Sequence, residues 1–305
     1  MHKNFIGTIK VLSTNFDKNI YNVFLFDEYL SYLKIQGLTL DTQKFYLDYV
    51  NRFIVLTKFD DINCFDSLLK LKVGYNNLTN KGISNNTINK YYLSIVKYTS
   101  FLLDNQLIKN KHYLKLQKVK ITKSLPNSLS SENIEIINNH LLSNYKIDFY
   151  KYRNYTIFQT LLNTGIRRNE LVHIKKEDVF NQYIKINNGK GNKDRIVYIT
   201  KEFSKLITEY LKLQNKNKIY VFCDYLGNKL DRDALSKVFT RIQRQTKIHL
   251  SPHLLRHTYA SLCIKKGINL YTLQQQLGHT DLKTTSIYLY LNSRENWEEI
   301  QKLQI

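Results

Sequence analysis

The sequence predicts a mainly helical protein with two domains, of which the second carries one small antiparallel sheet. The chain has 305 residues, which is more than one compact core usually holds. Apolar residues recur with helical spacing over most of its length. Two short segments, 183–187 and 194–199, instead alternate apolar and polar residues on either side of a polar turn with glycine, as the strands of a hairpin do.

Four amphipathic helices are expected in the first domain. The first begins near Asn22 and ends at Gly37, because glycine commonly follows the last turn of a helix. Ser84 can cap the start of the fourth. The apolar face of the first helix consists of Phe26, Tyr29, Leu30 and Leu33. The other three helices are expected at 40–57, 63–77 and 84–104.

A lysine-rich segment separates the two domains. Helical periodicity is lost between 114 and 129, where Pro126 and several serines favour an irregular chain. We therefore expect a helical domain at 18–113, a linker at 114–129 and a second domain at 130–305. The second domain has expected helices at 131–144 and 148–163, then the hairpin, and then helices to its C-terminus.

The charge of the chain favours a polyanionic partner. Lys and Arg number 46 against 25 Asp and Glu, which leaves a net charge of +21 and indicates salt-sensitive binding to nucleic acid. The chain is also rich in Asn, Ile and Tyr, a mixture that A+T-rich coding sequence produces by itself. Charge alone therefore leaves the function open.

Other features of the composition argue against export, membranes and metal binding by cysteine. Cys64, Cys223 and Cys263 lack the C-x-x-C spacing of zinc and redox sites, which fits a reduced cytoplasm. The N-terminal segment MHKNFIGTIKVLSTNFDKN lacks the apolar stretch of a signal peptide. No run of about 18 apolar residues occurs, so we expect no membrane-spanning helix.

Four separated motifs carry most of the chemical information. Each has an ordinary structural explanation when taken singly. They offer an arginine after a helix stop, a lysine at a hairpin tip, a histidine and an arginine on one helix face, and two of 23 tyrosines. The motifs are TGIRRNEL (164–171), GKGNKDR (189–195), PHLLRHTYAS (252–261) and LGHTDLKTTSIYLY (277–290).

Taken together in this order, the motifs resemble the active site of the tyrosine recombinases, the family of Xer proteins and phage-type integrases. The signature of that family runs Arg, Lys, His-x-x-Arg, His or Trp, and Tyr. The resemblance spans essentially the whole second domain. The first domain is similar to the helical, SAM-like core-binding domain of the family in layout, although Asn110 is followed by Lys111 where the family often has Asn-Pro. The matching residues are Arg167, Lys190, His253, Arg256, His279 and Tyr288.

The resemblance implies cleavage of DNA without metal or nucleotide cofactor. Tyr288 is then the nucleophile that forms a 3′-phosphotyrosyl bond and conserves the energy of the broken phosphodiester. Arg167 and Arg256 suit the anionic phosphate, because each guanidinium can make forked, charge-assisted hydrogen bonds to its oxygens. His257, next to Arg256, is expected to be structural.

The same resemblance implies roles for four further residues. Lys190, on a turn with glycines, protonates the departing 5′ oxygen. His253 accepts the proton of the tyrosine, and His279 donates a hydrogen bond to the phosphate. Glu170 matches an acidic position of the family and is expected to brace an active-site arginine or histidine as a supporting residue.

Two of these positions have neighbours of the same type. Arg168 adjoins Arg167, and Tyr290 lies two residues after Tyr288. Two residues turn a helix by about 200°, so only one tyrosine can face the phosphate. The family arginine directly follows TG-I or TG-L, and Tyr288 stands nine residues after His279, which is the spacing of the family. Arg167 and Tyr288 are therefore preferred.

The resemblance also implies partners. Both domains are expected to clamp a duplex DNA recombination site, mainly through phosphates. Exchange of four strands implies a homo-tetramer on two DNA sites, or a hetero-tetramer with a second recombinase, in the cytoplasm at the nucleoid. A DNA translocase or other accessory protein is a further candidate partner. Trp297, Ile300 and Leu303 share one helical stripe, which favours an exchange helix that docks on a neighbouring subunit or packs on its own domain.

Several functions stay open within this resemblance. A type IB topoisomerase shares the nucleophile and the arginines, but the GKGNKDR and LGH motifs and the tail favour recombination. The intact residue set disfavours a catalytically inactive DNA-binding relative. Among recombinases, chain length and the Xer-like motifs favour resolution of chromosome or plasmid dimers, and integration or excision of a mobile element is the alternative.

Overall fold

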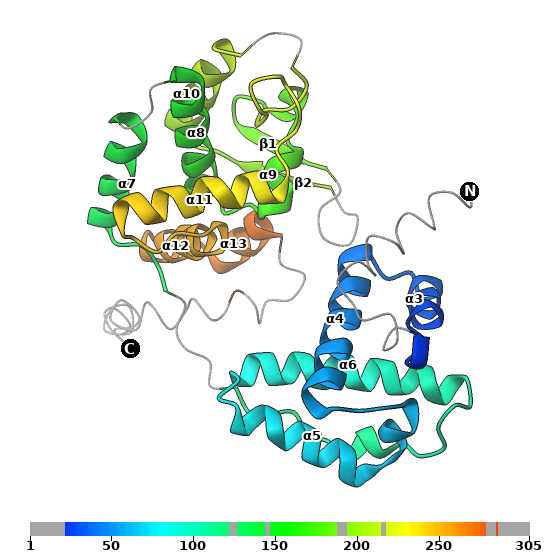
Figure 1. The fold of residues 1–305 in the computed structure, drawn as a ribbon. Coiled ribbons are helices and arrows are strands. Elements are labelled where there is room, and N and C mark those ends of the chain that lie inside the picture. The colour runs from blue at the N-terminus through cyan, green and yellow to red at the C-terminus, as the bar shows by residue number, and fades with distance from the viewer. Residues whose placement is uncertain are drawn as a thin grey trace, which may run out of the picture. The chain divides into compact units, whose positions relative to one another are not determined.

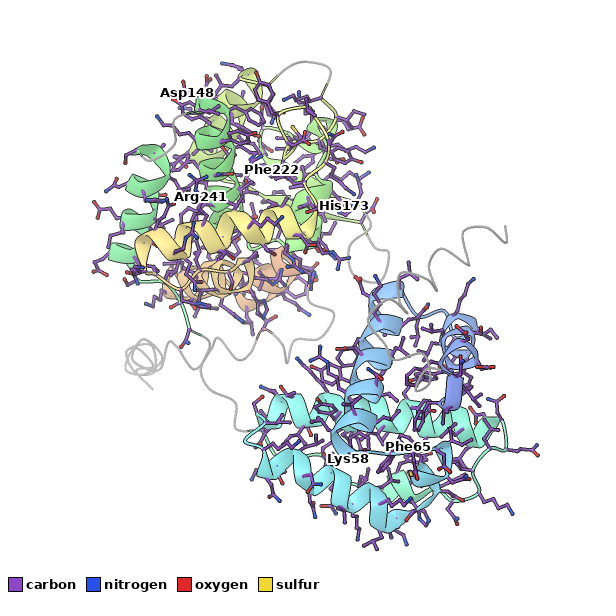
Figure 2. The ribbon with its side chains drawn as sticks, viewed as in Figure 1. Lys58, Phe65, Asp148, His173, Phe222 and Arg241 are labelled. Carbon is purple, nitrogen blue, oxygen red and sulfur yellow. The ribbon has the colours of Figure 1, made fainter. Side chains whose placement is uncertain are left out.

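The chain folds into two compact units (Figure 1), one at residues 1–123 and the other at residues 124–305. Each unit has its own core, with Phe65 fully buried in the first and Phe222 in the second (Figure 2). The described parts of both units are helices and loops, with a two-stranded antiparallel sheet in the second, which confirms the predicted fold class. The computed structural model describes residues 22–121, 127–143, 147–187, 194–214, 218–278 and Thr285.

Amphipathic helices surround the core of the first unit. α4 and α6 pack against each other, and α3 and α5 each contact both of them (Figure 1). Aromatic rings fill much of this core, where Tyr98 meets Phe65 edge to face at 5.0 Å between ring centroids. The elements are α3 (Phe26–Ile35), α4 (Leu40–Thr57), η1 (Ile62–Asp66), α5 (Leu68–Asn80), α6 (Asn85–Asp104) and η2 (His112–Lys115), the two η elements being 3₁₀ helices.

Some of the expected helix boundaries in this unit are confirmed and others are wrong. α3 buries the four predicted apolar residues and is followed by Gly37 at φ 71°. It begins at Phe26 and not near Asn22, because Leu25 has a left-handed conformation that interrupts the helix. The hydroxyl of Ser84 accepts from the N–H of Thr87 and caps α6. The single helix expected at 63–77 is wrong, because Asp61 caps a separate 3₁₀ helix and Ser67, in extended conformation, caps α5.

A central helix organises the second unit. α8 packs against α7, α10 and α12 (Figure 1) and buries Ile157, Phe158 and Leu161 completely. The helices are α7 (Ser131–Ser143), α8 (Asp148–Thr164), α9 (Arg168–His173), α10 (Lys201–Lys212), α11 (Arg232–Thr246), α12 (Pro252–Lys265) and α13 (Leu270–Leu277), with the 3₁₀ helix η3 (Lys176–Asp178). The strands are β1 (Tyr183–Ile186) and β2 (Arg195–Tyr198).

The strands pair as the alternating segments predicted. β1 and β2 are antiparallel, with Ile184 opposite Val197 and Ile186 opposite Arg195. Ile184, Ile186 and Val197 are buried in the core, and the residues between them are more exposed. The turn that joins the strands, at 188–193, lies outside the described residues.

Residues at the two ends of the expected linker belong to different cores. Leu116 is buried in the first core, and Leu129 is buried in the second. The N–H of Leu129 donates to the hydroxyl of Thr258 on α12 at 2.9 Å. The expected bounds of the domains and of the linker stay a prediction. Within the described ranges, no helix is both long and apolar enough to cross a membrane.

Candidate active site

The described part of the second unit contains four of the seven predicted site residues. Arg167, Glu170, His253 and Arg256 are all described, and they come from the α8–α9 turn, from α9 and from α12. The remaining three, Lys190, His279 and Tyr288, lie outside the described residues.

Gly165 forms the tight turn that leads from α8 to Arg167. It has a left-handed backbone conformation, with φ 61° and ψ 18°. A Cβ atom at this position would lie 2.5 Å from Cδ1 of Tyr259 and 2.8 Å from Cδ2 of Leu277. Both the backbone conformation and the close packing therefore require glycine. Two residues later the chain is extended at Arg167, which is the N-cap residue of α9.

Arg256 fastens this turn to the end of α13. Its side chain is buried on α12, where Nη1 donates to the carbonyl of Gly165 at 2.6 Å and Nη2 donates to the carbonyl of Leu277 at 2.9 Å. Ser251 caps α12 and Pro252 occupies its first turn, as suits a residue whose N–H has no helical partner there. The cap fixes the direction from which His253 and Arg256 extend.

Arg167 also binds the C-terminal end of α13. Its Nη2 donates to the carbonyl of Gly278 at 2.9 Å, and its Nη1 donates to Oε1 of Glu170 at 3.1 Å. The carboxylate of Glu170 also accepts from the backbone N–H of Arg167 at 2.7 Å and so caps α9. The predicted arginines thus lie together because they bind the main-chain carbonyls of the neighbouring residues Leu277 and Gly278.

Glu170 has a second cationic partner, Arg195, which ends the GKGNKDR motif but received no role in the sequence analysis. Nη1 and Nη2 of Arg195 donate to the two carboxylate oxygens at 2.6 and 2.8 Å. Burial raises the pKa of the Glu170 carboxyl, but the bonds and charge of Arg195, and then those of Arg167, outweigh it and lower the pKa to about 2. Glu170 is therefore ionised at neutral pH. Of the expected partners, an arginine or a histidine, Glu170 contacts Arg167, and its supporting role stays a prediction.

In the sequence, Arg195 is the last residue of the GKGNKDR motif and the second residue of a predicted strand, and neither position indicates a contact with Glu170. Arg195 is 25 residues away from Glu170, and no local spacing rule joins the two. The hairpin brings them together, since β2 begins at Arg195.

Gln276 connects α13 to the hairpin. Its side-chain oxygen accepts from the N–H of Tyr198 at 2.8 Å, and its side-chain nitrogen donates to the carbonyl of Tyr198 at 2.9 Å. Gly278, with φ 62°, follows the helix, and a Cβ atom there would lie 2.8 Å from Nε of Arg195. The sequence around LGH therefore needs glycine for the close approach of an arginine.

A pocket of about 400 Å³ opens beside these residues. Its described lining carries guanidinium groups and an imidazole and no carboxylate, so it suits an anion such as a phosphate group. Arg168 is at its edge and donates to the hydroxyl of Ser236 at 3.2 Å. The lining residues are Ile166, Arg167, Arg168, Ser251, Pro252, His253 and Arg256.

The two histidines of α12 are held in their neutral form. Burial and the nearby charge of Arg256 lower the pKa of His253 below its ordinary value of 6.5. The ring of His257 lies edge to face against that of His253, with 4.4 Å between centroids. Burial, His253 and Arg256 together lower the pKa of His257 to about 4. At neutral pH His253 can therefore accept a proton.

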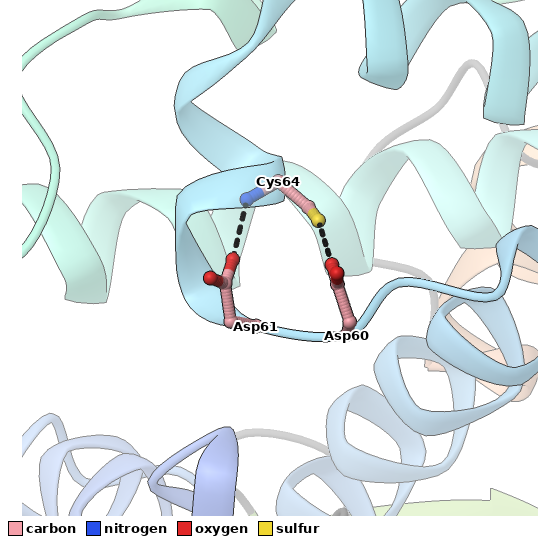
Figure 3. A group of neighbouring side chains, drawn as sticks. All are labelled: Asp60, Asp61 and Cys64. Carbon is pink, nitrogen blue, oxygen red and sulfur yellow. Dashed lines mark hydrogen bonds between the residues drawn. The ribbon is translucent and has the colours of Figure 1, made fainter.

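A separate group in the first unit has metal-binding residue types but another explanation. Asp60, Asp61 and Cys64 lie close together (Figure 3). The Asp61 carboxylate accepts from the N–H of Cys64 at 3.2 Å, and the thiol of Cys64 donates to Asp60 at 2.9 Å. The ammonium group of Lys70 lies 3.2 Å from the sulfur. Since that ammonium already supplies positive charge, the group serves as a helix cap with an ion pair.

Comparison with known proteins gives a consistent result. Residues 127–295 match the profile of the phage integrase family. The chain is 28% identical to tyrosine recombinase XerA of Pyrococcus horikoshii, over 94% of this chain and 96% of that protein. It is 30% identical to tyrosine recombinase XerA of Thermococcus onnurineus, over 86% and 89% of the two chains.

Solved structures share the fold. XerH recombinase bound to its difH substrate matches with a TM-score of 0.67 and 23% identity, covering 88% of this chain and 81% of that one. A lambda integrase dimer bound to a COC′ core site matches with a TM-score of 0.68 and 15% identity, covering 85% and 95%.

Proposed function

The chain belongs to the phage integrase family, and from this premise we propose how its residues carry out its reaction. It is a tyrosine recombinase, an enzyme that breaks and rejoins DNA at specific sites. The observation that carries the proposal is the pocket in which Arg167 and Arg256 surround a space for an anion beside a neutral His253.

The proposed reaction begins with a DNA phosphate in this pocket. Arg167 and Arg256 donate to its non-bridging oxygens and stabilise the charge of the pentacoordinate transition state. The phenol oxygen of Tyr288 bonds to phosphorus while His253 accepts the phenol proton. The bond from phosphorus to the 5′ oxygen breaks, and Lys190 gives that oxygen a proton. The 5′-hydroxyl of another strand then attacks the 3′-phosphotyrosine, releases the tyrosine and builds a Holliday junction.

The end of α13 supports a role for His279 at the same phosphate. Arg167 binds the carbonyl of Gly278, and His279 is the next residue along the chain. We propose that His279 donates a hydrogen bond to the phosphate and that Glu170 acts only as a support for Arg167. The guanidinium groups supply the positive charge of this scheme, which uses neither a metal nor a nucleotide.

We propose that the protein works as a tetramer on two duplex sites, either alone or with a second recombinase. The net charge of +21 supports contact with DNA phosphates by both units. In this arrangement 18–113 and 130–305 close around the duplex, 114–129 links them, and a helix that contains Trp297 joins neighbouring subunits. A DNA translocase is a proposed accessory partner, and the nucleoid is the proposed location.

The biological role that we propose is Xer-like resolution of chromosome or plasmid dimers. Two relatives that match over most of their length are named XerA, which supports this choice over a mobile element. Genome-wide mapping of covalently trapped DNA tests it. One peak near the replication terminus is expected, and peaks at the ends of mobile elements would overturn the assignment.

A nicked suicide duplex tests the chemistry. Duplexes that bind the protein are selected from a randomised library and nicked so that the short 5′-hydroxyl strand diffuses away after cleavage. The wild type is expected to form a covalent complex that survives SDS, and Tyr288→Phe is expected to form none. Relaxation of supercoiled DNA without recombinant products from two-site DNA would indicate a type IB topoisomerase instead.

A further inference from the structure

Arg195 binds the residue that braces Arg167 but does not line the phosphate pocket. We propose that Arg195 is a positioning residue for DNA cleavage, which neutralises Glu170 so that Arg167 can direct its charge to the scissile phosphate. This inference rests on the proposed function, in which Arg167 binds that phosphate.

The hydrogen bonds of Glu170 divide unequally between the two arginines. Arg195 takes both carboxylate oxygens at 2.6 and 2.8 Å, whereas the side chain of Arg167 makes one bond at 3.1 Å. A guanidinium has five N–H donors, and Arg167 uses one for Glu170 and one for the carbonyl of Gly278. Because the forked bond from Arg195 already occupies both carboxylate oxygens, Arg167 needs only one of its N–H groups for Glu170.

Exposure follows the same division. The side chains of Glu170 and Arg195 are 5% and 14% exposed, and that of Arg167 is 28% exposed. Only Arg167 of these three lines the pocket. Glu170 and Arg195 thus form a buried pair away from the pocket, and Arg167 is the member of the cluster that the pocket exposes.

The charge of the cluster depends on Arg195. Two guanidinium groups and one carboxylate leave one net positive charge. Without Arg195 the cluster would be neutral, and Arg167 would be the charged partner left for a buried carboxylate. An unpaired buried charge is strongly unfavourable, so Glu170 would draw Arg167 into a forked pair of its own. Fewer N–H groups of Arg167 would then face the phosphate.

Arg195 also joins the other parts of the site. Its Nε donates to the carbonyl of Gln276 at 3.4 Å and would lie 2.8 Å from a Cβ atom at residue 278. Along the chain it stands five residues after Lys190. A single side chain therefore links α9, the end of α13 and the hairpin strand.

The test measures single-turnover cleavage and DNA affinity separately, with the selected nicked duplex as the probe. Arg195→Met is expected to slow formation of the covalent complex about 10- to 100-fold, less than the roughly 100- to 1,000-fold loss when a direct oxyanion donor is removed. Its affinity for the uncleaved duplex is expected to match that of Arg244→Met. This matched control removes the same charge from an exposed position on α11.

The double variant Arg195→Met with Glu170→Gln distinguishes neutralisation from other roles. It restores the single positive charge of the cluster, so it is expected to cleave about 10-fold faster than Arg195→Met alone. Where circular dichroism shows both variants folded, a double variant no faster than the single one would overturn the inference, since a direct phosphate contact by Arg195 gives no rescue. If Arg195→Met does not fold, a double variant that cleaves within about 10-fold of the wild type supports the inference, and a greater loss overturns it.

The two proposals fail in different ways. A wild type that forms no covalent complex with the selected duplexes refutes the proposed function. A reactive wild type with an equally reactive Arg195→Met refutes the inference about Arg195 alone.

Discussion

Substitution of Gly165 by alanine should destabilise the protein through two effects that a second glycine separates. Alanine in the left-handed region costs about 1–2 kcal/mol. At 165 the new Cβ would also lie 2.5 Å from the ring of Tyr259 and 2.8 Å from Leu277, and such overpacking costs a further 1–3 kcal/mol or so. Gly165→Ala should therefore lower the free energy of unfolding by about 2–5 kcal/mol.

The matched control is Gly267→Ala. Gly267 also has a left-handed φ of 71°, and a Cβ atom there would have no neighbour within 4 Å. Its substitution should therefore cost only the backbone term, about 1–2 kcal/mol. Urea titrations of both variants and the wild type, followed by circular dichroism, measure the difference.

The site should respond as well. The carbonyl of Gly165 accepts a hydrogen bond from Arg256, so displacement of the turn should slow cleavage of the suicide duplex in Gly165→Ala and not in Gly267→Ala. Equal losses of stability in the two variants would refute the reasoning, because they would mean that Tyr259 and Leu277 move aside at no cost.

Three further predictions concern titration and the α13 contact. The pKa of Glu170 is lowered from 4.5 to about 2, so the stability that this carboxylate contributes is present above pH 4.5 and is lost as the pH falls toward 2. Over this pH range the urea midpoint of Glu170→Gln should fall less than that of the wild type. Parallel curves for the two proteins would contradict the assignment. The pKa of His253 lies below its ordinary value of 6.5, so the imidazole stays able to accept a proton, and the cleavage rate should stay level, down to about pH 6.5. The rate should fall only below that pH. A fall centred above pH 6.5 would count against His253 as the proton acceptor. Gln276→Met removes the side-chain partner of the N–H and the carbonyl of Tyr198 and should lower the free energy of unfolding by roughly 1–3 kcal/mol. Faster hydrogen exchange at the Tyr198 amide is the direct measurement. Unchanged exchange would show that another group replaces Gln276.

Features that local rules govern were predictable from the sequence. The buried face of α3, the cap at Ser84 and the alternating strands depend on residues a few positions apart, and the structure confirms them. The break at Ser67 was missed although its signals are local, because the apolar spacing continues across it while the Asp61 and Ser67 caps divide the helix.

The site was predictable only in part. The resemblance selected Arg167 and Arg256, and the structure places both at one pocket, while their roles at the phosphate stay a prediction. Arg195 could not be found in this way, because its bond to Glu170 depends on how the hairpin folds against α9 and α13. Spacing in the sequence carries no information about a contact made by tertiary folding.

The main-chain carbonyls that hold the arginines have a consequence for mutational tolerance. Gly165, Leu277 and Gly278 bind Arg256 and Arg167 through oxygens that every amino acid possesses. A side-chain substitution at 277 cannot delete such an acceptor; it can only shift the path of the backbone. A saturation library at Leu277 should therefore separate variants by the size and shape of the new side chain, with polar character of little importance to the arginine contact. Residue 277 can therefore change while its carbonyl still binds Arg256, whereas positions 165 and 278 stay glycine because of their left-handed backbone and close neighbours.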